Sequence, residues 1–158
     1  MTEASSFLSL VVFLHVISAV LWVGGMIAIR FAVHYSMQNI AEPRIKLART
    51  LENLKRFFNM VIPAIIILLI TAIILIITLG FKGTPLYSIV IVKEAIWTVM
   101  TIVFISIYIK RNKAEKAFIA GDFLGAKNLL APIAKYYIPL NIVLGIIAIY
   151  LGVTLRGF

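Results

Sequence analysis

The stretch FFNMVIPAIIILLITAIILIITL, residues 57–79, contains no charged side chain. The hydrocarbon core of a bilayer is crossed by about 20 apolar residues in an α-helix, so this stretch predicts a transmembrane helix. Three further apolar runs give the same prediction, and the four expected spans are residues 7–29, 57–79, 86–109 and 136–155. The 158-residue chain is 63% hydrophobic with a mean hydropathy of +1.09, far above soluble proteins. We therefore expect an all-α integral membrane protein in contact with a lipid bilayer.

Basic residues gather in two of the three connections. Six basic and two acidic residues lie between Arg30 and Arg56, and the same numbers lie between Lys110 and Lys135. The positive-inside rule places both loops in the cytoplasm and both termini outside. If the source is a prokaryote, the membrane is the plasma or inner membrane. Because topology accounts for the basic charge, we expect no nucleic-acid binding. Glu3 stands where a signal peptide carries basic residues, so the first run is expected to remain in the mature protein.

The connections are too short to contain a soluble domain, and residues 1–158 are expected to form one membrane domain. Alternating spans with short connections predict an up-down bundle of four transmembrane helices. Apolar residues recur between charges in residues 44–55, which indicates an amphipathic helix that extends the second span. Residues 113–130 have a similar pattern, with expected breaks at Gly121 and Gly125.

Small residues predict the faces on which these helices pack, because they allow close approach in lipid. One stripe is expected on the first span and one on the fourth. The first consists of Gly24, Ala28 and Ala32, and the second of Asn141, Gly145, Ala148 and Gly152.

Ionisable side chains inside the spans are the main candidates for function, since they are costly there and usually face the bundle interior. His15 lies about 12 Å inward from the start of the first span, and Lys93 about 10 Å inward on the third, at ~1.5 Å per residue. Thr71 on the second span reaches a similar depth. The three side chains could therefore meet at one level. The structural alternative is that Lys93 extends toward the headgroups, that Glu94 pairs with it, and that His15 is a hydrogen-bonded interior histidine.

Aromatic and methionine side chains extend this polar level. Trp22 and Met26 share the helical face of His15, while Trp97 and Met100 follow Lys93 on the third span. An isolated imidazole with such neighbours favours haem b, with copper as the alternative. Lys93 favours haem slightly, because an ammonium can pair with a propionate but would repel a bare copper ion.

A second histidine, His34, is a further candidate metal ligand, with Met37 on the same face. His15 and His34 are 19 residues apart, about 28 Å along a helix. They cannot ligate the same haem within one subunit. A bis-histidine haem would therefore require a homodimer, whereas a second haem near His34 would create a transmembrane electron path.

Three segments resemble the CopD-like copper-resistance domain. They are LHVISAVLWVGGMIAI, RFFNMVIPAIIILLITAII and TPLYSIVIVKEAIWTVMTIVFISIYIKRNKA, which resemble its first, second and third helices. A more distant similarity is to HemJ-type protoporphyrinogen oxidase, in the order of His15, Trp22, Gly25, Arg30 and His34. Ile29 stands where that family has a proline. The resemblance implies His15 and Lys93 as the site pair, copper handling from the first family and haem binding from the second.

Together these patterns lead to one principal expectation and two alternatives. The principal expectation is a haem b protein with a redox role, either electron transfer or oxidation of a membrane-soluble quinol or porphyrinogen. His15 would be the axial ligand, Lys93 would contact a propionate, and the remaining side chains would line the pocket, namely Trp22, Met26, Trp97 and Met100. The alternatives are copper transport or tolerance and a cofactor-free membrane assembly subunit.

Overall fold

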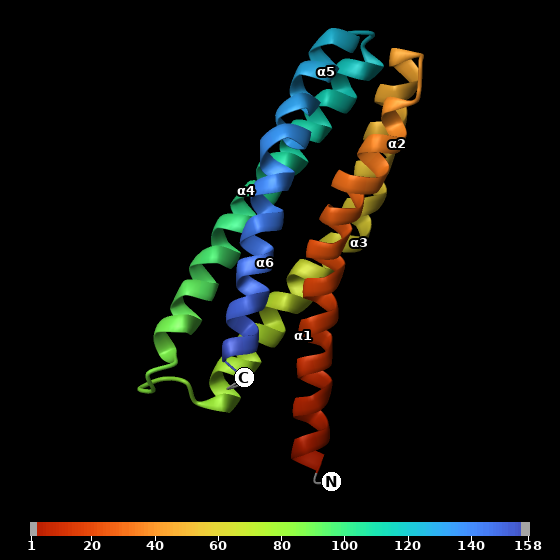
Figure 1. The fold of residues 1–158 in the computed structure, drawn as a ribbon. Coiled ribbons are helices and arrows are strands. Elements are labelled where there is room, and N and C mark those ends of the chain that lie inside the picture. The colour runs from red at the N-terminus through yellow and green to blue at the C-terminus, as the bar shows by residue number, and fades with distance from the viewer. Residues whose placement is uncertain (1–2, 156–158) are drawn as a thin grey trace.

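Four long helical rods build the protein, as Figure 1 shows for the computed structural model, which describes residues 3–155. In chain order the elements are α1 (Glu3–Ala28), the π-helix η1 (Ile29–Val33), α2 (His34–Gln38), α3 (Pro43–Leu79), α4 (Tyr87–Ile119), α5 (Phe123–Pro132), the π-helix η2 (Ile133–Tyr137) and α6 (Ile138–Thr154). The four rods are Ser5–Gln38, Pro43–Leu79, Tyr87–Ile119 and Phe123–Thr154, and each is long and apolar enough to cross a membrane. The expected all-α, four-helix membrane fold is confirmed.

The rods run alternately in opposite directions (Figure 1). Both chain ends and the α3–α4 connection lie at one end of the bundle, which we call the terminal end. The α2–α3 and α4–α5 connections lie at the other, which we call the basic end because its surroundings contain most of the lysines and arginines. Helix α1 packs against α3 and α6, and α4 packs against α3, α5 and α6. Helices α1 and α4 are therefore diagonal to each other across the bundle interior.

Helix α3 is longer than a membrane requires, because the amphipathic segment at residues 44–55 continues into the second span as expected. Pro43 occupies the first turn, where its missing N–H removes no helical hydrogen bond. The helix ends at Gly80, whose φ of 62° is easily adopted only without a side chain.

The connection between α4 and α5 breaks at Gly121, which has a φ of 84°. The break expected at Gly125 is wrong. Gly125 lies within α5, and its N–H donates to Asp122 Oδ1 over 2.8 Å. Asp122 thus caps the new helix and starts it before Gly125 is reached.

Only one of the two small-residue stripes packs against another helix. Gly145 on α6 is buried, and a Cβ there would lie 2.5 Å from Val23 Cγ2 on α1. The stripe at Gly24, Ala28 and Ala32 is exposed, and nothing lies within 4 Å of a Cβ built at Gly24. The close approach on α1 occurs instead at Gly25, beside the ring of Phe57. The prediction for the first span is therefore wrong by one residue, because α1 turns Gly25 rather than Gly24 toward α3.

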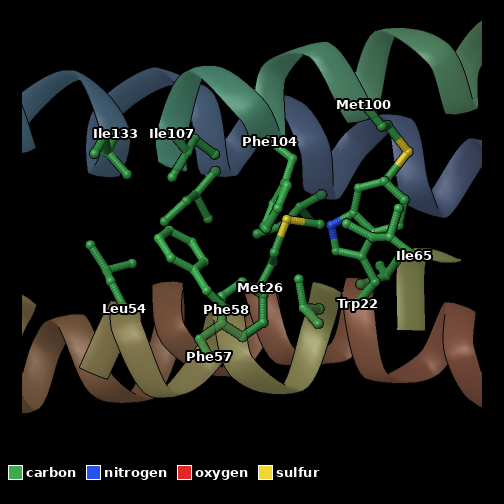
Figure 2. Packing of buried hydrophobic residues seen from close by; sticks show 14 of the residues in the cluster. Trp22, Met26, Leu54, Phe57, Phe58, Ile65, Met100, Phe104, Ile107 and Ile133 are labelled. Atoms are coloured by element: carbon green, nitrogen blue, oxygen red, sulfur yellow. The ribbon is translucent and has the colours of Figure 1, made fainter. Parts of the chain in front are cut away.

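The bundle interior is filled by an aromatic and methionine core (Figure 2). The ring of Phe104 meets Trp22 and Phe58 edge to face, with centroids 6.2 Å and 5.3 Å apart. Large apolar side chains are also exposed around the outside of all four rods, among them Phe13, Ile66, Ile102 and Ile146. An apolar outer surface of this extent fits contact with lipid rather than water.

Two π-helices interrupt the first and fourth rods. In the fourth, η2 ends two residues before Pro139, which has no N–H and whose ring would crowd the carbonyl group of residue 135 in a regular helix. A wider turn at this point relieves that conflict. No proline accompanies η1 at Ile29–Val33, and nothing in its local sequence explains it.

Candidate cofactor site

His15 on α1 is anchored to Thr71 on α3, with 2.9 Å between Nδ1 and Oγ1. The expectation that these side chains share one level is confirmed. Thr71 is buried, and its hydroxyl donates to the carbonyl oxygen of Ile67 over 2.7 Å, with Leu68 O at 3.1 Å. A hydroxyl has one proton to give. With that proton directed to its own helix, His15 Nδ1 is the donor and Thr71 Oγ1 the acceptor in the bond between the two side chains.

This arrangement of the hydrogen bond corresponds to one tautomer of His15. With the proton on Nδ1, the other ring nitrogen, Nε2, retains its lone pair. Metal-ligating histidines are typically held in this way, by donation from one ring nitrogen to a neighbouring oxygen. The His15–Thr71 pair therefore presents an imidazole ready to accept a metal or a proton.

Lys93 approaches the same region from the diagonal helix α4. Its side chain is half-buried and crosses to α6, where a Cβ built at Gly152 would lie 2.9 Å from Nζ. Gly152 thus leaves the space that the ammonium occupies.

Glu94 does not join this pair. It is exposed on α4, and in the described part of the chain the ion pairs are all at the basic end, where they involve Glu52 and Glu115. Neither Lys93 nor Glu94 takes part in one of them. The positive charge near His15 is therefore not neutralised by a carboxylate of the described residues.

The other expected pocket residues lie deeper in the bundle. Trp22, Met26 and Met100 are almost fully buried in the core, where Figure 2 shows the indole nitrogen of Trp22 pointing toward the end of Met26. Trp97 is half-buried and packs against this core. These four side chains thus extend inward from the level of His15 and Lys93 as a packed layer.

Three polar atoms in this layer have no hydrogen-bond partner among the described residues. They are Nε1 of Trp22, Nε1 of Trp97 and Oδ1 of Asn141. The Asn141 side chain is fully buried, and its Nδ2 donates to the carbonyl oxygen of Met100 over 3.0 Å. Buried donors and acceptors normally find partners, and the two indole N–H groups are the unused donors that a polar group in the interior could engage. The sequence indicated Asn141 as a member of a small-residue stripe and of a cluster near the basic end, and not as a buried group in the interior.

His34 belongs to a separate location near the basic end. It lines a partly open pocket with Arg30, Met37 and Asn53, between η1 on one side and η2 on the other. Lys46 Nζ donates to Gln38 Oε1 over 2.6 Å, and Gln38 Nε2 lies 3.2 Å from His34 Nε2. The structure therefore keeps His15 and His34 at different sites, as their spacing predicts.

Within residues 3–155, no three histidine or acidic side chains come together. The chain contains no cysteine. An ion at His15 would therefore take its further ligands from other donor types, such as thioethers, or from a group that brings its own.

The fold and these residues define an integral membrane four-helix protein with one imidazole and one ammonium in its interior. No family model, curated protein or solved structure matches this chain. Its function is therefore argued from the site itself.

Proposed function

We propose that this protein is a membrane haem b protein with a redox role, in which His15 is the axial ligand. The observation that carries the proposal is the hydrogen bond from His15 Nδ1 to Thr71 Oγ1, which leaves Nε2 as the free ligand atom. Bundle cofactors are usually held between facing helices by inward side chains. His15 and Lys93 come from the diagonal helices α1 and α4 and meet this description.

The residues around His15 fit a haem in their chemistry. The Lys93 ammonium suits a propionate, since it has no ion pair among the described residues. The unpaired indole N–H groups of Trp22 and Trp97 supply two further donors in the interior. Haem iron would supply one-electron redox chemistry, while the protein side chains bind, orient and shield it from water.

The membrane location bears on the redox partner. A site flanked by lipid-exposed helices favours a partner that dissolves in the bilayer, such as a quinol or a porphyrinogen. The excess of lysine and arginine at the basic end supports a cytoplasmic position for that end, with both termini outside. His15 and Lys93 would then lie nearer the outer face.

The sixth ligand position is a separate element of the proposal. His34 is at the other site of the same chain. It can be the sixth ligand of the haem at His15 only if it comes from a second chain. Otherwise it can ligate a second haem of its own. A homodimer with shared ligation and a monomer with an open sixth position are distinguished by the haem count per chain and by the low-spin or high-spin absorption spectrum.

Copper remains the alternative to haem as the group bound by His15. Copper(I) accepts imidazole and thioether ligands, and Met26 and Met100 are the methionines of the adjoining core. Both are packed in the core, so either cofactor would require these side chains to move apart. The Lys93 ammonium favours haem, since it would pair with a propionate but would repel a copper ion.

The deciding experiment is a reduced-minus-oxidised visible spectrum of the full chain purified in detergent, with iron and copper counted in the same sample. We expect a b-type α-band and at least one iron per chain. His15→Ala should lose this haem, whereas the matched variant His34→Ala should retain at least one equivalent. A colourless protein after haem supplementation, or equal haem retention in both variants, would contradict the proposal. Stoichiometric copper without colour would support the copper alternative.

A further inference from the structure

A polar pocket lies between α3 and α4 at the basic end, away from both histidines. Its lining includes Lys55 and Asn59 of α3, and Tyr108, Asn112, Glu115 and Lys116 of α4. We call it the α3–α4 pocket.

Arg111 also borders this pocket, but its donors are fully used within the protein. The guanidinium donates from Nε and Nη2 to the carbonyl oxygen of Leu51, from Nη1 to Asn112 Oδ1, and from both terminal nitrogens to Glu115. All five N–H groups are thereby accounted for. Arg111 therefore ties α4 to α3 and neutralises Glu115, and it is not free to bind a ligand.

The remaining lining groups are predominantly donors. With Glu115 neutralised, Lys55 and Lys116 contribute two positive charges that no ion pair of residues 3–155 compensates. Asn112 accepts from Arg111 through Oδ1, so its Nδ2 amide group is left to donate elsewhere. Asn59 and the hydroxyl of Tyr108 complete a set suited to an anion with several acceptor oxygens.

The position of the α3–α4 pocket in the bundle indicates which class of anion it binds. One turn further into the membrane, the same two helices expose Ile62 and Ile105, while Tyr108 is itself 41% exposed at the pocket. A ligand at this site would meet cations at its head and apolar side chains along its tail. Basic pockets between transmembrane helices commonly bind anionic lipid headgroups.

We propose that the α3–α4 pocket binds the phosphate headgroup of an anionic phospholipid, whose acyl chains lie along α3 and α4. This site is independent of any cofactor at His15. Lys55 and Lys116 contact the phosphate, the two asparagines supply hydrogen bonds, and Arg111 positions Asn112 without touching the lipid.

The test measures binding of phosphatidylglycerol and phosphatidylcholine to the full chain in detergent, by native mass spectrometry. The pocket variant is Lys55→Gln with Lys116→Gln. The matched control is Lys113→Gln with Lys127→Gln, which removes the same charge from exposed positions outside the pocket. Helix content by circular dichroism verifies folding, and Lys55→Arg with Lys116→Arg tests whether positive charge restores binding.

We expect phosphatidylglycerol to bind about 10- to 30-fold more weakly to the pocket variant, from the loss of two lysines near the membrane surface. The control should change by less than about 2-fold, since its lysines lie outside the pocket. Phosphatidylcholine should bind weakly to all variants, and inorganic phosphate should not displace the lipid. Equal losses in pocket and control variants would overturn the proposal, as would equal binding of the two lipids. Displacement by inorganic phosphate at the concentration of the lipid would assign the pocket to a free phosphate compound instead.

Discussion

Replacing Arg111 with methionine should destabilise the bundle more than any other single loss of charge at the basic end. The Arg111 side chain is 4% exposed and that of Glu115 is 36% exposed. Arg111→Met would leave the Glu115 carboxylate without its counter-charge and would remove the bond to the carbonyl oxygen of Leu51. Methionine extends as far as the position of Nε, so it keeps the packing of the aliphatic part of the side chain and removes the guanidinium.

The size of the destabilisation by Arg111→Met follows from the exposed fractions of these two side chains. Removing one partner of a fully buried ion pair costs about 3–5 kcal/mol, but Glu115 is partly in contact with solvent and can regain hydration. Because this hydration reduces the cost of the unpaired carboxylate, we expect the free energy of unfolding to fall by about 2–3 kcal/mol. For a chain of this length, the midpoint of thermal unfolding should fall by roughly 5–10 °C.

The assay is thermal unfolding in one detergent, followed by circular dichroism. Lys113→Met is the control, because Lys113 lies on the same helix, is exposed and forms no ion pair within the described residues. Adding Glu115→Leu to Arg111→Met should recover most of the loss, since no unpaired carboxylate would remain. Equal midpoints for Arg111→Met and Lys113→Met would refute the reasoning.

Three further predictions concern the bundle interior. Gly145→Ala should cost about 1–3 kcal/mol in the free energy of unfolding through overpacking against Val23, whereas Gly24→Ala, which meets nothing, should be neutral in the same assay. Thr71→Val should weaken haem binding about 10- to 100-fold by removing the partner of His15, while Thr78→Val at an exposed position should not; equal titration curves for both would contradict the assigned tautomer. Asn141→Leu should change stability by about 1 kcal/mol or less, because the lost bond to Met100 is offset by removal of an unpaired oxygen. A loss above about 3 kcal/mol would mean that this oxygen has a partner.

The helices were predictable because long apolar runs have few alternatives in a membrane. The shared depth of His15 and Thr71 was also predictable, since a fixed rise per residue converts sequence position into depth. Rotation about the helix axis was harder to predict. Whether Gly24 or Gly25 faces α3 depends on how the aromatic side chains of the other helices fill the interior, and Phe57 decides this through packing.

The polar contacts at the basic end were not predictable for a related reason. Arg111 reads in the sequence as one basic residue among several at a helix exit. Its burial depends on the carbonyl oxygen of Leu51, which is 60 positions away in the chain. Such partners are defined only when the helices come together. The unpaired atoms of Trp22, Trp97 and Asn141 are hidden in the sequence for the same reason.

The π-helix at Ile29–Val33 sets the angular relation between the two histidines. In a regular α-helix, 19 residues correspond to five full turns and about 100° more, which would place His34 well around the rod from His15. A π-turn accommodates one additional residue, which cancels nearly all of that excess. Both imidazoles are thereby aligned along one side of the first rod, at different heights. Deleting the single residue Ala32 would restore a regular helix with 18 residues, or five full turns, between the two positions, so His34 would keep the side that it now faces.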